Sequence, residues 1–144
     1  MPVGIPMLMF VSYRHAEQRI LGHLHERGFG DLTLAQLRLA ARLDDDGSRL
    51  TTLAAAAQVT KQTAGFLVDQ LEKAGYVERQ PDPTDARARL VVLADRGHTV
   101  RLAAREMEER LEAEWTEHLG PARMDALHQA LASLREVTDP FRPG

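Results

Sequence analysis

The hydrophobic pattern in the middle of the chain changes from a helical period to an extended one, and few folds accommodate that order. Residues 48–57 and 60–74 carry apolar residues at helical spacing, with a tight corner between them. Residues 76–79 and 89–93 are short and extended in character. The stretch 80–85 is rich in turn formers, and its two prolines exclude a helix. The sequence therefore predicts a helix, a tight turn, a second helix and a β-hairpin.

The two central helices carry small and apolar residues that can face each other. These residues are Leu53, Ala54 and Ala57 on the first helix, and Ala64, Leu67, Val68 and Leu71 on the second. The alanines allow a close approach, and Val59 would fill the corner between the helices. This is the packing that a helix-turn-helix unit needs.

Helix signals on both sides of this unit predict a mainly α-helical chain of about six helices with a small β-hairpin wing. The outer helices are expected at residues 6–27, 34–43, 95–119 and from Pro121 onward, where a first-turn proline is tolerated. Either Asp31 or Thr33 can cap the second helix, Ser48 the third and Thr60 the fourth.

Composition is consistent with a single compact domain over residues 1–144, of which 44% are hydrophobic. The absence of cysteine excludes disulfides and thiolate metal sites. No apolar run reaches the roughly 20 residues that a membrane span needs. The apolar start, residues 1–11, lacks the basic segment and cleavage site of a signal peptide. We therefore expect a cytoplasmic protein without a membrane partner.

Bulk charge gives no support to nucleic-acid binding. The formal net charge is −3, whereas a strongly basic domain would be the usual electrostatic signature. Residues 60–96 hold six basic residues (Lys61, Lys73, Arg79, Arg87, Arg89, Arg96) and six acidic ones (Asp69, Glu72, Glu78, Asp82, Asp85, Asp95). A case for DNA must rest on where particular side chains lie.

The second central helix would present an exposed face near its N-terminus. This face holds Lys61, Gln62, Gly65, Phe66 and Asp69, flanked by Thr60 and Thr63. Lys61 can contact a phosphate or a guanine edge, and Gln62 has the paired donor and acceptor that suit an adenine edge. Phe66 can touch a thymine methyl or a sugar. Taken alone, the same residues also fit a well-capped, solvated helix.

Two arginines follow the turn of the predicted hairpin. Arg87 and Arg89 lie where a wing would reach an adjacent minor groove, and arginine suits that narrow, negative groove. Solvated surface arginines are the alternative interpretation. The hairpin directly after two packed helices favours the DNA interpretation.

An ordered series of short motifs runs through residues 53–87. It consists of Leu53-Ala54, Val59-Thr60-Lys61-Gln62-Thr63, Leu67-Val68-Asp69-Gln70-Leu71-Glu72, Gly75-Tyr76-Val77-Glu78-Arg79 and Asp82-Pro83-Thr84-Asp85-Ala86-Arg87. Together they resemble the MarR (multiple antibiotic resistance regulator) family of winged helix-turn-helix transcriptional regulators. Residues 32–36 resemble the second helix of that family, and Gly97 resembles the entry to its fifth helix. The similarity covers about residues 32–97, and the outer helices match only in length and position.

The resemblance implies roles for several residues. Thr60 to Phe66 would enter the major groove, Arg87 would enter the minor groove, and Asp85 would orient Arg87 by a charge-assisted contact. It also implies an interleaved homodimer. Residues 31–96 would then form the DNA-binding lobe, and the helices of residues 5–28 and 97–138 would form the dimerisation region.

The chain departs from the family pattern at five positions. Gln58 stands where glycine is usual, Ala57 replaces a leucine, and Ala86 replaces a common arginine. Gly65 and Phe66 occupy positions that are more often polar. These differences bear on target sequence and affinity more than on the fold.

Other chemistry has little support in the sequence. The six histidines show no ligand spacing typical of a metal site, so we expect no metal and no cofactor. No nucleophile elbow, phosphate-binding loop or dinucleotide fingerprint is present, so we do not expect an enzyme.

The sequence therefore predicts a dimeric, sequence-specific DNA-binding regulator, a repressor at a pseudo-palindromic operator by analogy with the family. A small aromatic or phenolic effector would bind near Tyr13, Arg14, Leu37 and Trp115, which we select by position and polarity. The alternative is a winged-helix module that binds another protein and has no significant affinity for DNA.

Overall fold

The structure of the protein is a computed structural model, and residues 1–141 are described. Its elements follow in the order α1 (Ile5–Glu26), α2 (Leu34–Ala40), α3 (Leu50–Ala57), α4 (Lys61–Lys73), β1 (Val77–Asp82), β2 (Asp85–Leu93), α5 (Asp95–Leu119) and α6 (Pro121–Thr138). The predicted mainly helical fold with a β-hairpin wing is confirmed. The chain divides into two compact units, and the boundary in the sequence falls within α5, between Arg105 and Glu106.

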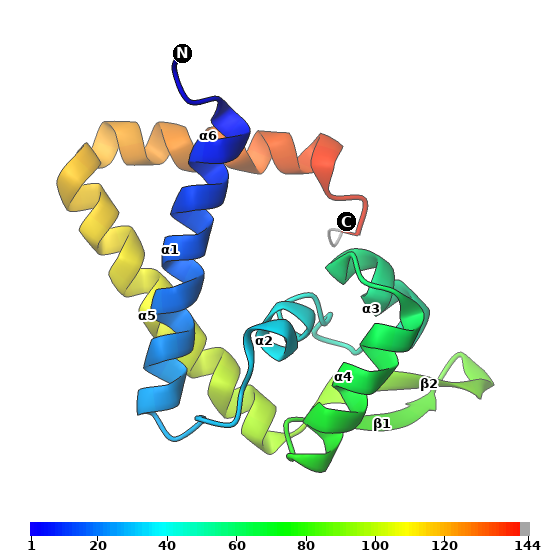
Figure 1. Ribbon diagram of the computed structural model, residues 1–144. Helices are drawn as coiled ribbons and strands as arrows, with labels where there is room; N and C mark the ends of the chain where they lie inside the picture. The colour runs from blue at the N-terminus through cyan, green and yellow to red at the C-terminus, as the bar shows by residue number, and fades with distance from the viewer. Residues whose placement is uncertain (142–144) are drawn as a thin grey trace. The chain divides into compact units, whose positions relative to one another are not determined.

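The core of the first unit lies where the two central helices meet. Leu53 and Ala54 of α3 and Ala64, Leu67, Val68 and Leu71 of α4 are all buried in one cluster. Ala57 and Val59 are half-buried and pack against it. Figure 1 shows α3 and α4 beside the hairpin formed by β1 and β2, whose turn extends away from the helices. The predicted helix-turn-helix packing is confirmed.

Helix starts and stops follow local chemistry. Thr33, rather than Asp31, caps α2: its hydroxyl accepts from the Gln36 N–H at 3.2 Å, and the Gln36 side chain accepts from the Thr33 N–H at 3.1 Å. The Thr60 hydroxyl accepts from the Thr63 N–H at 3.0 Å and caps α4. Helix α2 ends at Ala40, earlier than the predicted Leu43.

The prediction that Ser48 caps α3 was wrong. Ser48 forms an antiparallel bridge with Val91, in which each backbone N–H donates to the other residue's carbonyl. Its hydroxyl accepts from the Asp44 N–H at 3.0 Å and closes the preceding turn. The residue that precedes α3 is Arg49, which makes no side-chain cap. Pairing with β2 holds Ser48 in an extended conformation and directs its hydroxyl away from the helix.

The hairpin strands are longer than predicted. β1 continues through Gln80 and Pro81, where the sequence predicted a turn, and β2 begins at Asp85 rather than Arg89. Pro81 lies opposite Arg89, and the register shifts immediately after it. Because Ser48 bridges to the other side of β2, β1 is the edge strand, where a proline costs no ladder hydrogen bond.

The helices differ in length. In residues 1–141, none of them is both long enough and apolar enough to cross a lipid bilayer.

Candidate nucleic-acid interface

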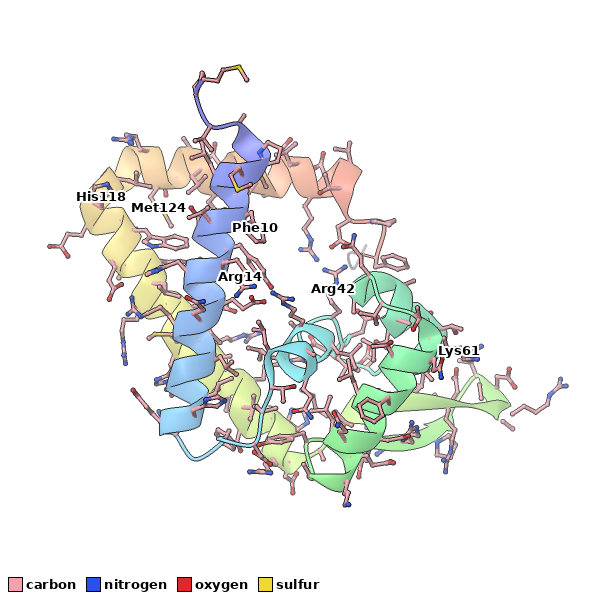
Figure 2. The ribbon with its side chains drawn as sticks, in the orientation of Figure 1. Phe10, Arg14, Arg42, Lys61, His118 and Met124 are labelled. Atoms are coloured by element: carbon pink, nitrogen blue, oxygen red, sulfur yellow. The ribbon has the colours of Figure 1, made fainter. Side chains whose placement is uncertain are left out.

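The N-terminal part of α4 presents an exposed face. Lys61, Gln62 and Phe66 are exposed, and Gly65 is half-buried. The hydroxyls of Thr60 and Thr63 lie 3.0 Å apart at the start of the helix. Figure 2 shows Lys61 on the outside of the helix-turn-helix unit, at the beginning of α4. The structure thus gathers the predicted helix residues on one surface with the positive end of the helix dipole.

Two carboxylates further along α4 are paired within the protein. The Arg79 guanidinium of β1 donates to Asp69 and Glu72, each at 2.8 Å, and Glu72 also accepts from the Arg79 N–H at 3.1 Å. These contacts tie β1 to α4 and offset negative charge that would otherwise repel a phosphate backbone. No local sequence pattern contains this cluster, because seven to ten residues separate the partners.

The wing carries both predicted arginines on β2. Arg87 and Arg89 are exposed. The contact expected between Asp85 and the Arg87 guanidinium is not the one observed, since Asp85 accepts from the backbone N–H of Arg87 at 3.0 Å. The Asp85 carboxylate lies 3.7 Å from the guanidinium of Arg49 instead. Within residues 1–141, the Arg87 guanidinium makes no hydrogen bond or ion pair.

A second ion pair anchors the wing beside its turn. Arg49, at the start of α3, donates to the buried carboxylate of Asp82 at 2.8 Å. Asp82 also accepts from the N–H and the hydroxyl of Thr84, at 2.8 and 2.7 Å. The pKa of Asp82 lies below its usual value. The largest causes are the two hydrogen bonds from Thr84, and the hydrogen bond from Arg49 is the next largest. The wing is thereby connected to the helix-turn-helix unit at its turn, by residues that the sequence analysis did not select.

Arg96 connects the start of α5 to the loop that follows α1. Its guanidinium lies 4.2 Å from the ring centre of Tyr76 and 5.6 Å from that of Phe29. It also forms an ion pair with Asp31 at 3.0 Å and donates to the Ala74 carbonyl at 2.9 Å. The Tyr76 hydroxyl donates to Asp31, and this hydrogen bond lowers the pKa of Asp31. The pKa of Tyr76 is raised, mainly because the side chain is buried and also because of this hydrogen bond.

Two of the proposed effector residues meet at a buried carboxylate. The Tyr13 hydroxyl donates to Glu17 at 2.8 Å, and the Arg14 guanidinium lies 3.5 Å from the same group. Arg38 of α2 binds Glu17 through two hydrogen bonds, of 2.7 and 2.8 Å. The Glu17 side chain is only 3% exposed, and the bond from Arg38 lowers its pKa. The i+4 and i+3 spacing of Glu17 from Tyr13 and Arg14 was the available signal, and it was missed.

The other two predicted effector residues are Leu37 and Trp115. Leu37 of α2 is half-buried and packs against the core of the first unit. Trp115 is half-buried and belongs to the second unit. Figure 2 shows Phe10 and Arg14 on α1. They are four residues apart and therefore lie on the same face of the helix. In the part of the chain that the structure describes, no three histidine or carboxylate side chains gather as a metal site would require.

Comparisons with known proteins agree on the central segment and on the fold. Residues 30–88 match the sequence model of the MarR family. No protein of curated function matches the sequence. A transcriptional regulator from Thermotoga maritima is 26% identical, with a TM-score of 0.64 over 92% of this chain and 91% of that chain.

Two further solved structures are similar over nearly their whole length. Wild-type MarR from E. coli, in its apo form, has a TM-score of 0.72 at 20% identity, over 93% of this chain and 98% of that one. A MarR transcriptional regulator from Methanosarcina mazei has a TM-score of 0.74 at 20% identity, over 92% and 94% of the two chains. Residues 30–88, which hold the helix-turn-helix and most of the wing, are therefore similar to the MarR family, and the chain as a whole has the winged-helix fold of these solved structures.

Proposed function

We propose that the protein is a sequence-specific DNA-binding regulator of transcription. The observation that carries this proposal is the exposed N-terminal face of α4, on a MarR-family helix-turn-helix core, with two exposed arginines on the adjoining wing. Lys61, Gln62 and the Arg87 guanidinium are not engaged by other side chains within residues 1–141. Polar side chains left without protein partners on a rigid scaffold are suited to an external ligand.

The same arrangement suggests how DNA would be bound. Residues 60–66 would enter the major groove, with Lys61 on a phosphate or guanine and Gln62 on an adenine edge. The backbone amides at the start of α4 would attract a phosphate. Arg87 and Arg89 would approach the neighbouring minor groove, which is most negative where it is narrow. In this proposal residues 31–96 form the DNA-binding lobe.

A second copy of the chain is the proposed partner of the outer helices, residues 5–28 and 97–138. The first half of α1 exposes five apolar side chains by more than half: Ile5, Met7, Leu8, Phe10 and Val11. On α6, Leu127, Leu131, Leu134 and Val137 are exposed at helical spacing. Monomeric proteins rarely leave such contiguous apolar faces in water. Two-fold symmetry would place the two α4 helices about 34 Å apart, which fits a pseudo-palindromic operator.

Regulation would follow from this geometry. A dimer on a promoter would act as a repressor by occupying the site. An aromatic or phenolic effector near Tyr13, Arg14 and Leu37 would release it by favouring a dimer that no longer fits both half-sites. Isothermal titration with a panel of aromatic acids tests the effector, and the absence of heat across the panel would contradict it.

A protein-interaction module is the second candidate, favoured by the net charge of −3 and the balanced charge of residues 60–96. The deciding experiment is selection from a random duplex library with the full-length chain, followed by binding of the winners across a salt series. A regulator should recover an inverted repeat and lose affinity steeply as salt rises, because each phosphate contact releases counterions. If no sequence is recovered even at low salt, the DNA-binding proposal is wrong and a protein partner is favoured.

A further inference from the structure

Phe66 is an aromatic side chain in an unusual place. It is 62% exposed, although its neighbours Ala64, Leu67 and Val68 on α4 are buried in the core. Its ring makes no aromatic or cation–π contact within residues 1–141. Leaving a phenyl ring in water is unfavourable, so a side chain of this kind on a binding face is a candidate for an apolar contact with the ligand.

The exposed face of α4 divides into an engaged part and an unengaged part. Towards the C-terminus, Asp69 is held by Arg79 at 2.8 Å, and Gln70 accepts from Gln36 at 3.0 Å. Towards the N-terminus, the side chains of Lys61, Gln62 and Phe66 have no hydrogen bond, ion pair or ring contact in the described chain. The face of α4 thus has a short patch without partners in the described chain, which consists of Lys61, Gln62 and Phe66.

Gly65 makes the backbone of this patch accessible. It lies one turn after Gln62, on the same face, and a side chain there would meet only Leu50, at 3.7 Å from the added Cβ. The core therefore has space for an alanine at this position. The absence of a side chain lets a ligand approach the helix closely beside the phenyl ring.

We propose that Phe66 determines operator specificity by packing against the 5-methyl group of a thymine in each half-site. This inference rests on the proposed function. In the major groove the thymine methyl is the apolar feature that distinguishes one base pair from the others, and an aromatic side chain can contact it. Gln62 lies four residues earlier on the same face, about 6 Å along the helix. The thymine should therefore lie about two base pairs from the base that Gln62 reads, at about 3.4 Å per step.

The test uses the operator recovered by selection, with each thymine replaced in turn by uracil, which lacks only the methyl group. Full-length wild type and Phe66→Ala are compared on every duplex. Burying one methyl group corresponds to about a fourfold change in affinity per half-site. At one position of each half-site, replacing that single thymine with uracil should weaken wild-type binding by about this factor and leave Phe66→Ala binding unchanged. Lys61→Ala is the matched control: it should weaken binding to all duplexes and keep the wild-type ratio between thymine and uracil.

The outcomes separate this inference from the proposed function. If an operator is recovered but no thymine shows a uracil effect that Phe66→Ala abolishes, the regulator proposal stands and the methyl contact is overturned. Equal weakening of Phe66→Ala on thymine and uracil duplexes would also overturn it, since that result indicates packing on a sugar. If no operator is recovered, the proposed function fails and the inference fails with it. Circular dichroism and thermal unfolding check that both variants are folded.

Discussion

At the scale of single residues, Arg87 offers the simplest test of the wing. Its guanidinium is exposed and makes no ion pair within residues 1–141, so Arg87→Ala should leave the thermal unfolding midpoint unchanged. On operator DNA the variant should bind more weakly, and the slope of log K against log salt should fall by about 1 per wing. Lys73→Ala removes an exposed cation from the last turn of α4, outside the proposed contacts, and is the matched control. Unchanged affinity in a fluorescence anisotropy titration would remove Arg87 from the interface.

Gly97 tests the joint between α5 and the wing. A Cβ atom there would lie 2.1 Å from the Tyr76 carbonyl oxygen and 2.9 Å from the Leu93 side chain. That carbonyl accepts from the Ala94 N–H at 3.0 Å, so it cannot move without breaking a backbone hydrogen bond. Gly97→Ala should therefore lower the free energy of unfolding by about 1–3 kcal/mol or more.

The control for that substitution lies on α1. A Cβ added to Gly22 meets nothing within 4 Å, and the residue is inside a helix. Gly22→Ala should raise the free energy of unfolding by about 0.5–1 kcal/mol, because alanine is the better helix former. Urea unfolding measures both variants. If Gly97→Ala proved as stable as the wild type, the close approach of α5 to Tyr76 would be contradicted.

At the scale of elements, the ion pair between Glu17 and Arg38 joins α1 to α2. The carboxylate is buried, and Arg38 is 45% exposed, so solvent screens the pair in part. Glu17→Gln should lower the free energy of unfolding by about 1–3 kcal/mol at neutral pH. The pKa of Glu17 in the folded protein lies below its usual value. The pair therefore stabilises the fold above about pH 4.3, and this contribution is lost as the pH falls through the lowered pKa.

The measurement is urea unfolding of the wild type and Glu17→Gln at a series of pH values from 7 to 3. The difference in free energy between the two proteins should shrink as the pH falls below about 4. Glu26→Gln, which changes an exposed carboxylate on the same helix, is the control for charge alone. A difference that stays constant across the series would show that the ionised carboxylate does not stabilise the joint.

At the scale of the whole molecule, the apolar first half of α1 predicts self-association. Phe10 is 54% exposed and lies on α1, as Figure 2 shows. Introducing a charge there should disfavour burial against a second copy, so Phe10→Glu should sediment as a monomer where the wild type sediments as a dimer. Gln18→Glu adds the same charge at an exposed polar position of the helix and should stay dimeric. A wild type that is monomeric at micromolar concentration would contradict the dimer.

Much of the fold could be predicted from the sequence, because its signals are local. The bounds of α5, Asp95–Leu119, were predicted without error, and Thr60 and Pro121 mark the starts of α4 and α6 as expected. The core between α3 and α4 was predicted residue by residue, since helical periodicity fixes which side chains share a face. These features depend on residues within about four positions of one another.

The tertiary structure decided what depends on distant partners. The local sequence predicts that Ser48 caps a helix, but its backbone forms a β-bridge with Val91. The local sequence predicts a turn at Pro81, but Pro81 lies on an edge strand, where the strand can continue through a proline. The pairs Arg49–Asp82 and Glu17–Arg38 join residues 33 and 21 positions apart, and no local pattern contains them. The sequence by itself therefore determined the helices, the Thr60 cap of α4 and the exposed residues of α4. Only the folded chain determined which charges are paired within residues 1–141 and which remain exposed without a partner there, because that depends on the three-dimensional neighbours of each side chain.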